Sequence, residues 1–311
     1  MEDVLHEVYL PFTEAELHKH FAPVSAAQDG RHLEYYRKSM AHLAAYRAAS
    51  PSAKAKLLKR GRQHEKDERF WIVTGLMGIF HASDDPAVRL GLISALLERA
   101  RLSPPGDFTS WEAALAGELH LFFEVNLPAP VGYKAWLRDH VEERSFVPYV
   151  SETAGTGKAL EGATKADAML LSSTTGAAVI FEAKVLSDVS TQISYDAARN
   201  QLARLIDVML EQPKDRPPLS ARKPSLTTLV LVTPDLFRNA EAKATEGSRL
   251  YSWLLPRYRD PADGLLGQHL GHRHSDELRD VPGRLGWLAW EDFNLVAPGT
   301  CGWLGSGSAA T

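Results

Sequence analysis

The spacing of apolar and polar side chains divides the chain into a helical first third and a mixed α/β remainder. Residues 32–49 repeat apolar side chains at steps of three and four, which predicts an amphipathic helix. A second helix is expected over 53–63, and residues 70–80 are apolar on all sides, which is typical of a buried helix. Asp85-Pro86 then provides an N-cap and a first helical residue for another helix. Residues 103–107 (SPPGD) predict a linker.

Beyond this linker, segments of helical and extended character alternate. The expected helices are 109–125, 133–144, 191–210 and a short helix bent or ended by Pro256, and the expected strands are 145–153, the two halves of 165–185, 226–234 and the start of 285–293. This order predicts an α/β fold with a mixed central sheet flanked by helices, preceded by a helical N-terminal region. We expect a helical region of unknown role at 1–105, an α/β domain at 106–300 and a flexible tail at 301–311.

The segment 165–185 predicts a β-hairpin with a turn at residues 173–176 (STTG). If the hairpin is centred on that turn, the numbers of cross-strand partners add up to 349, which places Asp167 opposite Glu182 with Cβ atoms roughly 5 Å apart. Lys184 lies two residues beyond Glu182 and therefore on the same face of its strand. Two carboxylates and an ammonium group are thus expected to converge, as in a site for a divalent metal and a phosphate.

The residues around this hairpin support the prediction of a site. Residues 177–181 form an unbroken apolar run, which indicates a strand buried on both faces. Charged groups at the end of such a strand are costly unless they are paired or bind metal. A second Glu-Ala-Lys at 241–243 has no apolar run and no acid on a partner strand, and predicts only a solvated helix face. The alternative to a metal site is a buried salt bridge between Lys184 and one of the two acids.

Composition excludes several classes of protein. The chain of 311 residues is 44% hydrophobic and 24% charged, which is typical of a globular protein. A single cysteine, Cys301, excludes an internal disulfide framework and fits a reducing cytoplasm, where we expect the protein. No stretch predicts a signal peptide or a membrane helix. The net charge of −4 does not favour nucleic acid as a partner. Residues 54–69, however, contain seven basic and three acidic side chains, and this segment is interpreted either as a phosphate-binding surface or as a solvated helix face.

The order of elements, with Asp167 on the second strand and Glu182-Ala183-Lys184 on the third, resembles the restriction-endonuclease-like PD-(D/E)XK nuclease superfamily. The resemblance covers roughly residues 133–235 and extends at most to about 295; Ala166 stands where proline often precedes the aspartate. It implies that Asp167 and Glu182 bind Mg²⁺, which Mn²⁺ can replace, and that Lys184 orients or activates water. The residues agree, because Mg²⁺ needs only one or two carboxylates beside a phosphate. The Ala183 carbonyl is a candidate third ligand.

Several further residues are weaker candidates. Glu161 precedes Asp167 by six residues and is a possible third carboxylate, or a loop acid. Glu142 and Glu143 are alternatives for the acid that the family carries on its first helix. In the helix after the lysine, the resemblance implies a polar residue near the active site, for which Gln201 is the candidate, and Gln192 and Asn200 are noted as well. Tyr195 and Arg199 are interpreted as solvated surface, with contact to phosphate as the alternative. The triplet His269, His272 and His274 lacks nearby cysteine and is interpreted as a solvated loop.

We therefore expect an Mg²⁺-dependent endonuclease that hydrolyses phosphodiester bonds, with DNA favoured over RNA on the resemblance alone. Restriction, phage defence and mobile-element processing are roles that the family commonly has, and a homodimer is expected because many such nucleases cut two strands. The alternative is a catalytically inactive protein of this fold that binds nucleic acid or a protein partner. A third possibility is an interaction protein whose functional part is the helical region at 1–105.

Overall fold

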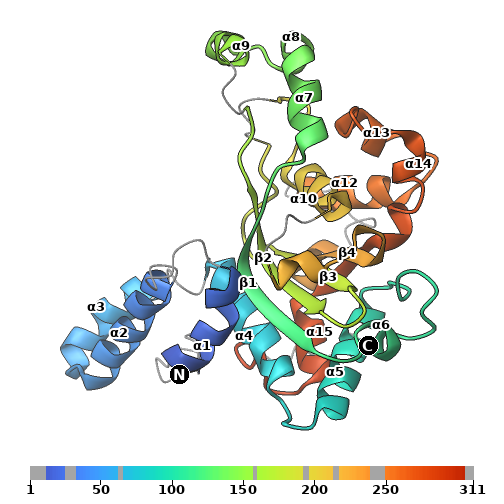
Figure 1. Ribbon diagram of the computed structural model, residues 1–311. Coiled ribbons are helices and arrows are strands. Elements are labelled where there is room, and N and C mark those ends of the chain that lie inside the picture. Colours follow the sequence, from blue (N-terminus) through green and yellow to red (C-terminus); the bar gives the residue numbers. More distant parts are fainter. Residues whose placement is uncertain are drawn as a thin grey trace.

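The computed structural model describes residues 12–24, 33–61, 66–156, 160–191, 196–212, 217–238 and 249–304 (Figure 1). The helices are α1 (Glu14–Phe21), α2 (Glu34–Ala48), α3 (Pro51–Gly61), α4 (Glu68–Phe80), α5 (Pro86–Arg99), α6 (Trp111–Ala114), α7 (Val131–Asp139), α8 (Val141–Arg144), α9 (Pro148–Gly155), α10 (Gln201–Leu210), α11 (Asp235–Arg238), α12 (Leu250–Arg259), α13 (Leu265–His269), α14 (Ser275–Leu278) and α15 (Trp290–Val296). The strands are β1 (Leu119–Leu127), β2 (Thr164–Ser172), β3 (Ala178–Ala183), β4 (Thr227–Thr233) and β5 (Leu285–Ala289).

The five strands form one mixed sheet in the order β1-β2-β3-β4-β5. β1, β2 and β3 are antiparallel neighbours, whereas β3, β4 and β5 run parallel to one another. A parallel neighbour requires a crossover connection, and α10 lies in the connection from β3 to β4. The carboxyl ends of the three parallel strands therefore share one edge of the sheet, where ligands bind in many open α/β sheets. The expected α/β class with a mixed central sheet is confirmed.

The register of the 165–185 hairpin is confirmed. Ala168 pairs with Phe181 and Leu171 with Ala178, so partner numbers add up to 349. The turn is closed by the Gly176 N–H, which donates to the Ser172 carbonyl over 2.9 Å. Gly176 has φ +83°, a backbone conformation that side chains rarely adopt, which explains why glycine stands there.

The helix expected over 109–125 is wrong for most of its length. α6 ends at Ala114, Gly117 follows with φ +84°, and residues 119–127 form strand β1. Its side chains contribute to the buried clusters on both faces of the sheet, with Phe123 on one and Val125 on the other. A strand covered on both faces has no clean alternation of apolar and polar residues, so its sequence is hard to distinguish from a buried helix.

The strand expected over 145–153 is also wrong, because Pro148 begins helix α9 and occupies a first-turn position where its missing N–H costs nothing. The helix expected over 191–210 begins only at Gln201. Asn200 is its N-cap, with a side-chain oxygen that accepts from the Ala203 N–H over 3.0 Å. The helix expected over 133–144 is interrupted near His140, which gives α7 and α8.

Helices cover both faces of the sheet (Figure 1). One core holds buried side chains of α1, α4, α5 and α15 against the sheet, and the other holds those of α10, α12 and α13. The first core combines residues from both sides of position 105, such as Phe70 and Phe181, so the N-terminal helices share a core with the strands. Two parts project from this body: the α2–α3 hairpin, and the α7–α9 unit with its own small core. None of the helices in the described ranges has the length and apolar character needed to cross a membrane.

Candidate active site

The sheet edge at the end of β3 positions Lys184. The Lys184 N–H donates to the Val232 carbonyl over 2.8 Å, which continues the pairing with β4. The Trp290 indole donates to the Lys184 carbonyl over 2.9 Å. With both of its main-chain groups held, Lys184 lies at a fixed point beyond the last residue of β3, and its side chain stays on the face of Glu182.

The structure brings together Asp167, Glu182, Lys184 and Gln201. Glu182 Oε1 accepts from Lys184 Nζ over 2.5 Å and from Gln201 Nε2 over 2.6 Å. Asp167 Oδ2 accepts from the Ala183 N–H over 2.7 Å. Gln201 is the first residue of α10, and its main chain and side chain both bond to Ser190. The N-terminus of α10 thus supplies a fixed amide to the Glu182 carboxylate.

Two of the four side chains of the site are almost fully buried, and the other two are partly exposed. Glu182 is 1% exposed and Lys184 is 3% exposed, whereas Asp167 and Gln201 are half-buried. Burial raises the pKa of Glu182, and repulsion from Asp167 raises it further. Burial likewise raises the pKa of Asp167, against the lowering effect of Lys184. Burial alone would lower the pKa of Lys184, but Glu182, Glu68 and Asp167 together raise it. Burial therefore disfavours the charged forms of the two carboxylates, whereas the neighbouring acids favour the charged form of the Lys184 ammonium.

Two acids of this site do not belong to the sequence motif. Glu68, the first residue of α4, has a carboxylate oxygen 3.5 Å from Lys184 Nζ and also accepts from the Ser187 hydroxyl. Glu124 on β1 lies beside Asp167, between two residues that pair with the strand of Asp167. Its φ of +52° is rare for a non-glycine residue, and such conformations concentrate at functional sites. The sequence carries no specific signal for Glu68, because an acid in the first turn of a helix is a common and favourable placement.

Other candidate residues lie elsewhere. Glu161 is buried and pairs with Arg204 over 2.8 Å and with Arg199 over 3.7 Å. Glu142 and Glu143 are both exposed on α8. The solvated surface favoured for Arg199 is wrong, since this side chain is buried and pairs with Asp207 over 2.7 Å.

The histidine triplet is not one solvated loop. His269 ends α13 and contacts the Tyr258 hydroxyl, and His272 Nε2 lies 3.0 Å from Asp207 Oδ1, while His274 is exposed. Three further positions of interest, Gln192, Tyr195 and the second Glu-Ala-Lys at 241–243, lie outside the described residues.

The donor set fits a hard divalent cation. Glu182 Oε2 is buried and has no hydrogen-bond partner among the described residues, so one carboxylate oxygen is available beside the half-buried Asp167. Within the described part of the chain no group of three or more His, Cys, Asp or Glu is arranged to hold a metal, and the Lys184 ammonium lies against the carboxylate instead. Mg²⁺ retains several waters and needs only one or two carboxylates. Asp167 and Glu182 meet that need, with Ala183 adjacent to both.

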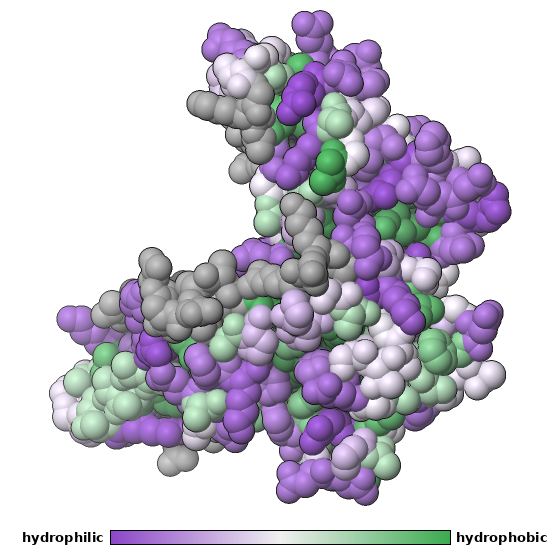
Figure 2. Space-filling view, viewed as in Figure 1, coloured by the Kyte–Doolittle hydropathy of each residue, from purple (hydrophilic) through white to green (hydrophobic). Residues whose placement is uncertain are grey.

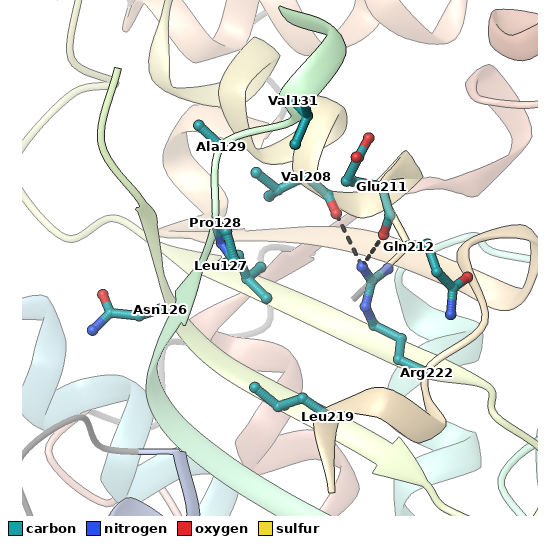
Figure 3. Close-up of a pocket in the computed structure, with 10 residues that line it drawn as sticks. All are labelled: Asn126, Leu127, Pro128, Ala129, Val131, Val208, Glu211, Gln212, Leu219 and Arg222. Atoms are coloured by element: carbon teal, nitrogen blue, oxygen red, sulfur yellow. Dashed lines mark hydrogen bonds between the residues drawn. The ribbon is translucent and has the colours of Figure 1, made fainter. Parts of the chain in front are cut away.

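A separate cavity of about 270 Å³ lies at the other end of α10 (Figure 3). Its walls are mostly apolar, and its one cationic side chain is Arg222, which is 2% exposed. The guanidinium donates to the main-chain carbonyls of Val208, Met209 and Glu211, so it caps the C-terminus of α10. Its donors are used for the helix, and the catalytic candidates are gathered at the opposite end of the same helix.

No family model matches this chain, and neither a curated protein nor a solved structure matches it.

Proposed function

We propose that this protein is a metal-dependent nuclease that hydrolyses phosphodiester bonds, with a restriction-endonuclease-like core. The observation that carries the proposal is the convergence of Asp167, Glu182 and Lys184 at the carboxyl edge of the parallel strands, in the hairpin register that the motif requires. The strand order and the crossover helix α10 fit the same core. Raised pKa values of clustered buried acids are typical of functional sites.

Each residue has a role in this proposal. Asp167 and Glu182 would hold Mg²⁺, which supplies polarisation of the phosphate and a water of lowered pKa. The Lys184 ammonium would exchange its contact with Glu182 for one with the attacking water or with negative charge that develops on the phosphate. Gln201 keeps the Glu182 carboxylate oriented through its 2.6 Å hydrogen bond. Glu68, which contacts Lys184 from the first turn of α4, is our candidate for the first-helix acid in place of Glu142 or Glu143.

The experiment is a cleavage assay on supercoiled plasmid, linear duplex DNA, single-stranded DNA and RNA, with Mg²⁺, Mn²⁺ or EDTA. Wild type is compared with Lys184→Ala, Asp167→Asn and a matched control, Lys223→Ala. Lys223 is exposed and its N–H donates to the Gly176 carbonyl, at the turn end of the hairpin away from Lys184. We expect metal-dependent cleavage in wild type and in Lys223→Ala, and a loss of about 1,000-fold or more in the other two variants, because several kcal/mol of transition-state stabilisation are removed.

The outcomes separate the alternatives. Equal cleavage by wild type and Lys184→Ala would assign the activity to another site or to a contaminant. Binding to nucleic acid that survives EDTA, without cleavage of any substrate, would favour the inactive binding protein. The buried Glu182–Lys184 pair would then be a structural ion pair.

A further inference from the structure

The α2–α3 hairpin carries a concentrated positive charge on a protein of opposite net charge. From the first residue of α2, Glu34, to the last residue of α3, Gly61, the chain has seven of its 35 Lys and Arg residues and one of its 39 Asp and Glu residues, although its formal net charge is −4. The rest of the chain is therefore strongly acidic. Such an asymmetry favours one polyanionic partner at one place on the surface.

The root of the hairpin, at the start of α2, packs against the body of the protein, and the rest of α2 and α3 projects from it. Leu33 and Tyr36, at the start of α2, are buried in the main core. Further out, the described side chains form a separate small cluster of Tyr46, Leu43 and Leu57 between the two helices. The His42 ring also bonds to the Leu57 carbonyl over 2.9 Å. Figures 1 and 2 show the hairpin standing out from the body, with a notch between it and the α7–α9 projection.

The described basic side chains of this hairpin differ in their contacts: Arg37 pairs with Glu14 over 2.5 Å, and the Lys54 ammonium lies 5.6 Å from the centre of the Tyr46 ring. Arg47 on α2 and Lys56 on α3 are exposed, and neither has an ion-pair partner in the described part of the chain. Lys38 is 70% exposed, and its ion-pair partner among the described residues is Glu34 of its own helix. Two exposed cations without an ion-pair partner can each neutralise a phosphate, and this neutralisation releases counterions that are condensed on the nucleic acid.

The chemistry of the surface favours a duplex backbone over unpaired bases. Single-stranded binding uses exposed aromatic rings on which bases stack. Both described aromatic side chains of the hairpin, Tyr36 and Tyr46, are buried. α2 has 15 residues and is about 22 Å long, which corresponds to roughly six base pairs of duplex. The surface is thus suited to contact phosphates without reading sequence.

The root of the hairpin lies beside the candidate catalytic acids. The Tyr36 hydroxyl donates to Glu124 over 3.4 Å, and Glu124 lies beside Asp167 in the pairing of β1 with β2. At the other end, α3 ends at Gly61 and α4 begins at Glu68, which contacts Lys184. The start of α2 therefore contacts an acid beside the site, and α4, the next helix after α3 in the chain, contributes Glu68 to it.

We propose that the α2–α3 hairpin binds the phosphate backbone of duplex nucleic acid and guides it to the acids at the end of β3. The identity of the bound duplex as a substrate rests on the proposed nuclease function, whereas the binding itself does not. Arg47 and Lys56 each contact a phosphate, one from each helix. The contact is independent of sequence.

The test measures binding and catalysis separately. Arg47→Gln/Lys56→Gln is compared with Lys134→Gln/Arg138→Gln, a control pair that removes the same charge from α7. Binding of a fluorescein-labelled DNA or RNA duplex is followed by anisotropy in the Lys184→Ala background, at salt concentrations from about 50 to 200 mM. We expect roughly tenfold weaker binding for the hairpin variant, and a slope of log affinity against log salt that is smaller by about 2. The α7 control should bind as the parent does.

Hydrolysis of bis-p-nitrophenyl phosphate, which is too small to reach the hairpin, reports on the catalytic site alone. Hairpin variants in the otherwise wild-type chain should hydrolyse it at the wild-type rate. If no ester is hydrolysed but the hairpin variant loses duplex binding, the nuclease proposal fails and the binding surface stands. Unchanged affinity and salt slope in the hairpin variant, or an equal loss in the α7 control, would overturn the binding proposal. Preference for DNA or RNA duplex in the same titration identifies the partner.

Discussion

Two clusters of buried charge lie along α10, and they are compensated in opposite ways. At its N-terminus, Gln201 contacts Glu182 beside Asp167 and Lys184, and burial raises the pKa of both acids. Near its middle, Asp207 is fully buried and accepts from Arg199 over 2.7 Å and from Arg273 over 2.8 Å, with His272 3.0 Å away. Burial alone would raise the pKa of Asp207, but His272, Arg199 and Arg273 lower it.

The difference lies in how completely each buried charge is compensated. Asp207 has several positively charged or hydrogen-bonding neighbours, so its ionised form is favoured, and it links α10 to the segment after α13. Arg199, its partner, also lies 3.6 Å from the centre of the Tyr133 ring on α7. At the other end, two or three acids share one ammonium, and Glu182 Oε2 has no partner within the described residues. Buried charge without full compensation costs stability.

The largest effect is expected for Asp207→Asn. It leaves Arg199 and Arg273 buried without their shared anion, which typically costs about 3–5 kcal/mol of unfolding free energy. Urea unfolding followed by circular dichroism measures the loss. Asp276→Asn is the matched control, because Asp276 and its partner Arg279 are both highly exposed and their pair contributes little. A stability change for Asp207→Asn as small as that of the control would remove the distinction between the two clusters.

Glu182→Gln should differ from Asp207→Asn in its pH dependence. Because the folded-state pKa of Glu182 lies above its ordinary value of 4.5, its stabilising effect is present below that pH and is lost as pH rises through the folded pKa. In the absence of metal, the stability of wild type relative to the glutamine variant should therefore fall by at least about 1 kcal/mol as pH rises from 5 toward 8, on top of the constant cost of leaving Lys184 without its closest anion. Urea unfolding at a series of pH values gives the difference.

Asp207→Asn supplies the contrast for this pH dependence. The pKa of Asp207 is lowered, so its contribution is present above the ordinary value of 3.8 and is lost only as pH falls below it. The deficit of Asp207→Asn should therefore stay constant between pH 7 and 8. If both variants showed the same pH trend, the assignment of one cluster as under-compensated would be incorrect. Added Mg²⁺ should stabilise wild type more than Glu182→Gln, because the variant lacks one ligand.

The site was partly predictable because its chemistry lies on adjacent strands. The turn at 173–176 fixes the hairpin register, and the register places Asp167 and Glu182 together. Asn200 and Gln201 were predicted within a longer helix, and the structure shows that α10 begins there, which is why Gln201 points at Glu182. Local turn geometry is encoded by a few neighbouring residues, so the hairpin could be predicted without the tertiary fold, whereas the Asn200 cap was missed.

Contacts between distant segments were not predictable in this way. Glu68 reaches Lys184 only because α4 packs against β2 and β3, and Asp207 meets His272 across 65 positions of the chain. The sequence around Asp207 indicates only an amphipathic helix. Strand β1 was missed because both of its faces are covered, which removes the alternation on which strand prediction depends. Tertiary packing, rather than local preference, decides these features.

Gln201→Ala tests the smallest expected effect, and it tests how α10 connects with the chemistry. The amide donates to Glu182 Oε1 but is not expected to touch substrate, so its loss should lower kcat by about 10-fold to 100-fold and leave KM nearly unchanged. Stability should change little, because Lys184 still bonds to the same oxygen. Gln201→Glu is the informative second variant. A third acid beside Glu182 should raise the pH at which activity appears, relative to Gln201→Ala. If Gln201 had a merely structural role, the alanine and glutamate variants would have the same pH profile. A wild-type rate in Gln201→Ala would show that the N-terminus of α10 does not position the Glu182 carboxylate for catalysis.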